Sequence, residues 1–128
     1  MKVLLDTYSF IWFIEGNALL STTARPLIEE PMNDVFLSVA SLWEMAIKIS
    51  IGKLQLKEPF DQLVPQQIQL NNITLLNIAL SHTIAVTQLP YHHRDPFDRL
   101  LIAQSLTESL PIVSIDGVFD QYGVNRVW

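Results

Sequence analysis

The amino-acid sequence predicts an α/β domain of three layers, α/β/α, with helices on both faces of a central, mainly parallel sheet of four to five strands. Short apolar runs of strand length alternate with longer segments of helical periodicity along the 128 residues. This alternation is typical of parallel sheets, whose strands are connected by helices that pack on the sheet. No internal repeat, low-complexity tract or linker divides the chain. Residues 1–128 are therefore expected to form a single domain.

The first expected elements are one strand and two short helices. Residues 2–5 form an apolar run that ends at Asp6, which is typical of a buried strand. A helix is expected over 7–15, where aromatic and branched apolar side chains supply a buried face. Ser21 can cap a second helix, which ends before Pro31.

The middle of the chain is expected to contain two strands and two helices. A strand over 35–37 leads into a long helix over 38–51, where apolar residues recur at helical spacing and Gly52 supplies the end. A weaker amphipathic helix follows over 60–70. An Asn-Asn pair then separates this helix from a strand over 73–76.

The remaining elements complete the alternating pattern. A helix over 79–89 ends before a proline, and a polar loop over 91–95 leads into a helix over 96–109. A fourth strand is expected over 112–115 and a short fifth strand over 124–127.

The composition narrows the class of protein. Hydrophobic residues make up 49% of the chain and charged residues 16%, which excludes a disordered chain. No apolar run approaches the roughly 18 residues of a membrane span, and the apolar start ends at Asp6, too early for a signal peptide. The absence of cysteine excludes disulfide frameworks and thiolate metal sites. We expect a cytoplasmic protein without a membrane partner.

The net charge of −5 is unfavourable for binding nucleic acid, because phosphate contacts usually need a basic surface. The cations are nevertheless placed close to acidic motifs. Lys48, Lys53 and Lys57 follow one such motif, and Arg94 and Arg99 flank another. A divalent cation among carboxylates would also reverse the local potential. Composition alone leaves the partner open.

Two acids are expected at the edge of the sheet where ligands bind. Asp6 follows the first strand and Asp116 follows the fourth, and ligand sites of parallel sheets lie beyond the carboxyl ends of the strands. The alternative is turn chemistry, because aspartate is common after strands and Asp116 precedes a glycine. The pair is harder to explain by turns than either acid alone.

Two further acids have local alternatives of their own. Ser41 and Glu44 match a capping box, in which the glutamate only bonds back to the helix start. Asp95 is suited to cap the next helix, with Asp98 in its first turn, where acids favour the helix dipole. Local sequence by itself favours these capping roles.

Their placement in the fold favours a different role. A helix that starts near the end of the second strand lets Glu44 face Asp6. Carboxylates gathered at one sheet edge repel one another unless cations share the site. Oxygen ligation without cysteine suits Mg²⁺ or Mn²⁺, which can activate water for attack on a phosphodiester.

Several segments resemble the PIN-domain family, and most closely its VapC-type ribonucleases, the toxins of type II toxin–antitoxin pairs. The resemblance covers essentially the whole chain, and the segment 89–104 is its most specific part. The segments are LLDT at 4–7, SVASLWEMAIK at 38–48, GKL at 52–54, LPYHHRDPFDRLLIAQ at 89–104 and SID at 114–116.

The resemblance implies a PIN-like fold and a ribonuclease that cuts RNA with a metal-activated water. It implies Mg²⁺ or Mn²⁺ as cofactor, RNA as substrate, a cognate antitoxin as partner and a homodimer. Thr7 is expected to hold the first acid or a metal-bound water, and Ser114 is a weaker supporting candidate. At Tyr8 many relatives have histidine, a difference expected to affect substrate contacts rather than catalysis. The implied catalytic and metal-binding residues are Asp6, Glu44, Asp98 and Asp116.

Other polar residues are candidates for contacts with RNA, each with an alternative. Lys48 can instead pair with Glu44 one helical turn back, and Arg99 can pair with Asp95. The two histidines lie in a polar loop, where RNA contact or loop structure is favoured over metal ligation. The RNA-binding candidates are Lys48, Lys53, His92, His93, Arg94 and Arg99.

Two other functions compete with a ribonuclease. One is an interaction module that keeps the PIN fold without turnover, which the intact set of acids argues against. The other is a receiver or phosphotransfer domain, in which Asp6 would accept a phosphoryl group. That function requires a second adjacent acid or a lysine near a strand end, and neither is evident in the sequence.

Overall fold

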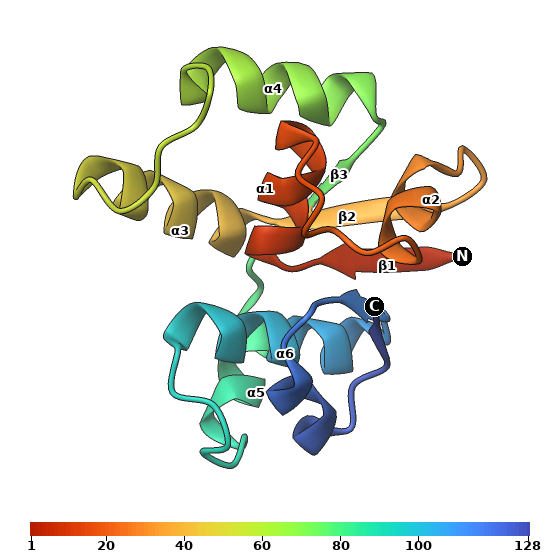
Figure 1. Ribbon diagram of the computed structural model, residues 1–128. Helices are drawn as coiled ribbons and strands as arrows, with labels where there is room; N and C mark the ends of the chain where they lie inside the picture. The colour runs from red at the N-terminus through yellow and green to blue at the C-terminus, as the bar shows by residue number, and fades with distance from the viewer.

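A parallel sheet organises the molecule. The computed structural model describes residues 1–128, and its five strands are all parallel, in the order β3-β2-β1-β4-β5 (Figure 1). This confirms the predicted α/β class and its central sheet. The strands are β1 (Lys2–Leu5), β2 (Asp34–Ser38), β3 (Thr74–Leu76), β4 (Ile112–Val113) and β5 (Arg126–Val127).

Helices cover both faces of the sheet. In Figure 1, α1, α2 and α4 lie above the sheet, and α5 and α6 lie below it, as predicted for three layers. None of the helices has both the length and the apolar character needed to cross a bilayer. The helices are α1 (Thr7–Glu15), α2 (Ala24–Glu29), α3 (Val39–Ser50), α4 (Phe60–Leu70), α5 (Leu80–Thr87) and α6 (Pro96–Glu108), with a 3-10 helix, η1 (Gly117–Tyr122).

The first strand is buried on both of its faces. Val3 and Leu5 belong to an apolar cluster that includes Phe10 of α1. Leu4 belongs to a second cluster, which includes Leu101 of α6. Because successive side chains of a strand point to opposite faces, a strand covered on both sides needs a continuous apolar run. This requirement explains the sequence of residues 2–5.

The strand register brings the functional candidates to one edge. Leu5 is aligned with Leu37 of β2 and with Val113 of β4. The carboxyl ends of these three central strands therefore lie at the same level. Asp6 and Ser114 follow β1 and β4 directly, so both lie at the edge where ligands of parallel sheets bind.

The start of α3 rules out the capping-box alternative for Ser41 and Glu44. Ser38 is the N-cap residue, and its hydroxyl accepts a hydrogen bond from the backbone N–H of Ala40. The helix therefore begins before Ser41, and Glu44 lies in its second turn, too far along to bond back to the helix start. The glutamate side chain is left for tertiary contacts.

The chain after β4 turns earlier than the sequence predicts. The strand ends at Val113 instead of residue 115. The Ser114 hydroxyl accepts a hydrogen bond from the backbone N–H of Asp116, and the Asp116 carboxylate in turn caps η1 by accepting from Val118 N–H. The Asp-Gly pair indicated a turn, but the 3-10 helix that follows it was not anticipated.

Candidate functional site

Asp6 is a buried carboxylate at the junction of β1 and α1. Its side chain is the N-cap of α1 and accepts a hydrogen bond of 2.8 Å from the backbone N–H of Ser9. The residue is only 7% exposed. Burial raises the pKa of Asp6, and hydrogen bonds from Ser9 and Ser114 offset this only in part. Ser114 thus contacts the first acid.

Glu44 is held from both sides on α3. The hydroxyl of Thr7 donates to Glu44 Oε1 at 2.6 Å, and Lys48 Nζ lies 2.7 Å from Oε2. Thr7 therefore contacts the second acid, whereas the sequence suggested the first acid or a metal-bound water. Glu44 is 2% exposed, so Lys48 supplies the charge that this buried carboxylate requires.

Lys48 forms an ion pair with Glu44, one helical turn back. The sequence offered this pair as the alternative to RNA binding. The ammonium group of Lys48 also lies 3.2 Å from the hydroxyl of Tyr8. Burial by itself would lower the pKa of Lys48, but the contacts with Glu44 and Tyr8 raise it above its ordinary value. The lysine thus remains protonated and links α3 to the start of α1.

Asp98 projects from the first turn of α6 toward the other acids. Asp95 is the N-cap residue, as predicted, and accepts hydrogen bonds from the N–H groups of Phe97 and Asp98. The pKa of Asp98 is raised to about 7 by burial and by the negative charges of Asp95, Glu44 and Asp6, while His93 acts in the opposite direction. Acids from three separate elements are therefore close enough to repel one another.

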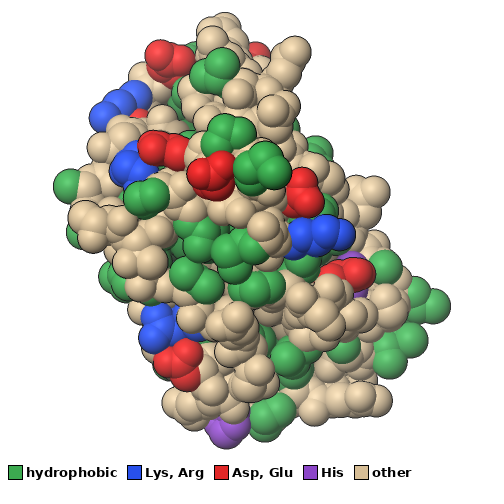
Figure 2. All heavy atoms as spheres, turned by 90° about the vertical axis from the view of Figure 1, so that its right-hand side faces the viewer, with side chains coloured by type: hydrophobic (Ala, Val, Ile, Leu, Met, Phe, Trp, Pro, Cys, Tyr) green, Lys and Arg blue, Asp and Glu red, His purple; other side chains and the backbone are tan.

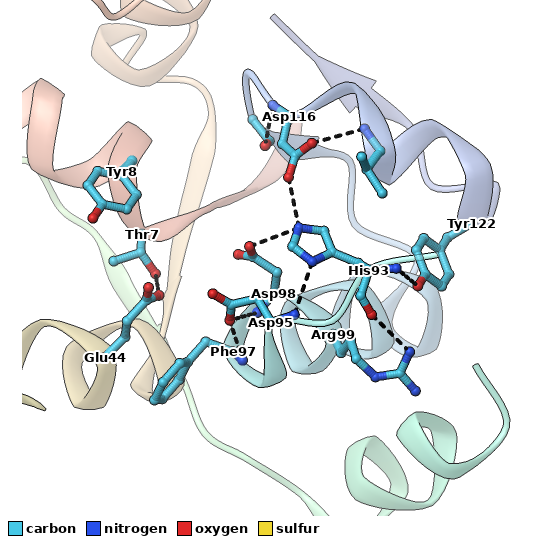
Figure 3. Close-up of polar contacts among 12 residues, drawn as sticks. Thr7, Tyr8, Glu44, His93, Asp95, Phe97, Asp98, Arg99, Asp116 and Tyr122 are labelled. Carbon is cyan, nitrogen blue, oxygen red and sulfur yellow. Dashed lines mark hydrogen bonds and ion pairs between the residues drawn. The ribbon is translucent and has the colours of Figure 1, made fainter. Parts of the chain in front are cut away.

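His93 links two of the acids. Its Nε2 atom lies 2.8 Å from Asp116 Oδ2 and 3.1 Å from Asp98 Oδ2 (Figure 3). The sequence favoured RNA contact or loop structure for this histidine and gave no sign of the bridge. The acids that it joins follow a strand and begin a helix, so only the tertiary fold brings them together.

A pocket lies between these groups. It is lined by acids and, on the side of α1, by aromatic rings. In Figure 3, Tyr8 and Thr7 lie on one side of the open space and Asp98 and Asp116 on the other, while Glu44 lies beyond Thr7. The lining residues are Asp6, Thr7, Tyr8, Trp12, Asp98, Ile115 and Asp116.

Arg99 has neither of the roles considered from the sequence. It is 5% exposed and forms no ion pair with Asp95. Instead, its guanidinium group donates to four backbone carbonyl oxygens in the last turn of α5 and the loop before α6, and it stacks 4.0 Å from the centre of the Tyr91 ring. It fixes the loop that carries His93 and is not free to bind phosphate. The acceptors are the carbonyl oxygens of Val86, Leu89, Pro90 and His93.

The other three RNA-binding candidates are exposed. Lys53 follows α3, and His92 and Arg94 lie in the loop before α6. The opposite, amino edge of the sheet carries scattered charges of both signs and no continuous group of Lys and Arg (Figure 2). That face therefore offers no basic surface for nucleic acid.

The acidic residues fit a hard divalent cation. The ligands expected from the sequence are all carboxylates, and the pKa of Asp98 is raised by burial and by the negative charges of Asp95, Glu44 and Asp6. The ligand atoms of His93, Asp98 and Asp116 lie within 4.8 Å of one another. Such a donor set suits a cation with oxygen ligands better than a zinc-type thiolate site.

Comparison with known proteins identifies a family and one curated relative. The model of the PIN domain matches residues 3–125. The chain is 34% identical over 59 residues to ribonuclease VapC16 of Mycobacterium tuberculosis, a match that covers 46% of this chain and 42% of the relative. The matched region thus spans less than half of that relative's length.

Solved structures share the fold at low sequence identity. The VapBC2 complex of Rickettsia felis, bound to promoter DNA, aligns with a TM-score of 0.73 at 14% identity and covers 99% of this chain and 98% of that chain. FitAcB of Neisseria gonorrhoeae aligns with a TM-score of 0.66 at 17% identity, over 100% and 97% of the two chains. VapBC-5 of M. tuberculosis aligns with a TM-score of 0.60 at 16% identity, over 98% and 95%.

Replacing Arg99 with lysine is expected to lower the free energy of unfolding by about 2 kcal/mol or more, because one ammonium group cannot reach the carbonyls that the planar guanidinium binds. Urea denaturation measures the change. The exposed Arg94→Lys variant is the matched control and should stay within about 0.5 kcal/mol of the parent. Equal stabilities for the two variants would contradict the structural role of Arg99.

In EDTA, the free energy of unfolding is expected to fall as the pH rises from about 4 to about 7. The unfolded chain loses the Asp98 proton near the ordinary pKa of 3.8, whereas the folded chain keeps it until about 7. The unfolded state then binds fewer protons, so stability decreases across this window, by at most about 4 kcal/mol for this group. Denaturation at several pH values should show a smaller decrease for Asp98→Asn, and an unchanged slope would disprove the assignment.

Proposed function

Because the chain belongs to the PIN-domain family, we propose that it is a divalent-metal-dependent endoribonuclease and the toxin of a toxin–antitoxin pair. The observation that carries this proposal is that Asp6, Asp98 and Asp116 line one pocket at the carboxyl edge of the sheet. The ribonuclease activity named for the curated relative agrees with it. Hydrolysis by water is expected to leave 5′-phosphate and 3′-hydroxyl ends.

The proposed cofactor is Mg²⁺ or Mn²⁺, held by Asp6, Asp98 and Asp116, with Glu44 beside them. Hard oxygen ligands suit both ions, which keep sites open for water and phosphate. When bound, such an ion would lower the pKa of a water molecule and neutralise charge that develops on the phosphodiester. The raised pKa of Asp98 supports this assignment, since a bound cation would relieve the repulsion among the acids.

Glu44 has the least direct role in this proposal. Both of its oxygens already have partners, Thr7 and Lys48. Lys48 also offers its positive charge at the margin of the pocket, where it contacts Tyr8. We assign Thr7 and Lys48 the task of fixing the Glu44 carboxylate, so that its negative potential acts beside Asp6.

RNA is proposed to approach along the exposed side of this pocket. Lys53, His92 and Arg94 are exposed and remain candidates for phosphate contacts. The pocket wall adds the ring of Tyr8, which is 38% exposed, beside the exposed side chain of Ile115. Aromatic rings next to a phosphate site can stack with unpaired bases.

The proposed protein partner is an antitoxin with a basic segment. The chain has a net charge of −5 and an acidic pocket, to which a cationic side chain is complementary. The structural neighbour VapBC-5 is a member of the VapBC family of toxin–antitoxin systems, and another neighbour is a toxin–antitoxin complex from Klebsiella pneumoniae. An inserted arginine or lysine would occupy the pocket and neutralise the acids needed for metal.

A homodimer is proposed through the β3 side of the molecule. β3 is an edge strand, and next to it the chain exposes large apolar side chains. Leu75 and Ile78 are each 42% exposed, Ile84 is 51% exposed and Leu80 is 76% exposed. Apolar side chains grouped at a sheet edge are typical of an interface.

The nuclease proposal predicts that Asp6→Asn and Asp98→Asn each lower Mn²⁺-dependent RNA cleavage by about 100-fold or more, the effect of losing a charge-stabilising group. The measurement is the initial rate on a mixed RNA pool, with and without EDTA. Asp61→Asn is the matched control, because Asp61 is an exposed acid in the first turn of α4, and its rate should equal that of the parent.

Equal background cleavage in the parent and both site variants would contradict the proposal. That result would favour a PIN-fold interaction module without turnover. Cleavage that persists in EDTA but is lost in the variants would contradict only the metal dependence.

A further inference from the structure

We propose that His93 is a positioning residue, which holds the carboxylates of Asp98 and Asp116 in the arrangement that receives the cation, and that it is not itself a metal ligand. The inference rests on the proposed metal-dependent function and adds a residue to it. Nε2 of His93 lies 3.1 Å from Asp98 Oδ2 and 2.8 Å from Asp116 Oδ2. One side chain therefore joins an acid of α6 to an acid at the start of η1.

The hydrogen bond at the other ring nitrogen defines the tautomer. The backbone N–H of Asp95 donates to His93 Nδ1 at 3.2 Å. A nitrogen that accepts from an N–H group carries no proton, so the neutral ring has its proton on Nε2. Nε2–H then donates toward the two carboxylates and has no lone pair for a metal. The short distances among His93, Asp98 and Asp116 thus indicate that His93 donates a hydrogen bond to the two acids and is not a third metal ligand.

The ring is held in place from the elements that carry the acids. The backbone N–H of His93 donates to the Tyr122 hydroxyl at 2.7 Å (Figure 3). This hydroxyl donates to the Pro90 carbonyl at 2.8 Å. Arg99 donates to the same Pro90 carbonyl at 2.9 Å. Tyr122 ends η1 and Arg99 lies on α6, so the loop of His93 is fixed to both acidic elements. Phe119 contacts the ring edge, with centroids 5.8 Å apart.

The two acids need such a support because neither is fixed by its own helix alone. Asp116 uses Oδ1 to cap η1, which leaves Oδ2 to His93, and its side chain is 35% exposed. Asp98 has no other hydrogen-bonded partner for its carboxylate than the His93 contact. A donor between two like charges reduces their repulsion and the cost of ordering them. Partners of this kind typically change metal affinity by about 10- to 100-fold.

Calorimetry with Mn²⁺ on the intact protein tests the proposal. His93→Ala should weaken Mn²⁺ binding by about 10- to 100-fold, and His93→Gln, which keeps an N–H donor, should recover part of the loss. Tyr122→Phe should weaken binding by a smaller factor, although Tyr122 touches neither acid. Asp61→Asn is the control, since Asp61 is an exposed acid of α4 that does not line the pocket, and its Mn²⁺ affinity should be unchanged.

Two spectroscopic measurements separate positioning from ligation. In the metal-free parent, ¹⁵N NMR of the histidine rings should show His93 with the proton on Nε2. Pulsed EPR of bound Mn²⁺ should show no coupling to a directly coordinated nitrogen. A coordinated imidazole signal that disappears in His93→Ala would overturn the proposal.

The outcomes also distinguish this inference from the function on which it rests. If the parent binds Mn²⁺ and His93→Ala binds it equally well, the positioning role is wrong while the metal-dependent function stands. If the parent binds no Mn²⁺ at the pocket, both proposals fail together.

Discussion

The central constraint on this structure is the electrostatic repulsion among carboxylates that lie together at the partly buried carboxyl edge of the sheet. Asp6, Glu44 and Asp98 come from three separate elements and each raises the energy of its neighbours' charged forms. Such an arrangement destabilises a protein unless something offsets it. In this chain the offset is incomplete, since Asp98 still has a pKa of about 7. A fold that retains this repulsion between carboxylates is suited to bind a cation.

Several surrounding polar groups stabilise the carboxylates against this repulsion. Ser9 donates to Asp6, and Thr7 and Lys48 hold Glu44. His93 lies between the remaining two acids, and Arg99 fixes its loop through carbonyl groups. Most of these partners are hydrogen-bond donors rather than full charges. They order the carboxylates without cancelling the negative potential that a metal needs.

Much of the fold and of the acidic site could be predicted from the sequence, because apolar periodicity and strand order are local signals. Apolar periodicity predicted the strand before Asp6, and the order of the strands predicted that Asp116 lies at the same edge of the sheet. The contacts of His93 and Arg99 could not be predicted, since they depend on how the loop before α6 folds back onto η1. Local spacing also suggested a capping role for Glu44, which a helix start at Ser38 excludes.

The most direct test is the location of the cation itself. Crystals grown with Mn²⁺ and measured at a wavelength where manganese scatters anomalously should show a peak in the pocket, within bonding distance of carboxylate oxygens of Asp6, Asp98 or Asp116. A fully ordered pocket with no peak at saturating Mn²⁺, or a peak bound only elsewhere on the surface, would contradict a metal-dependent nuclease.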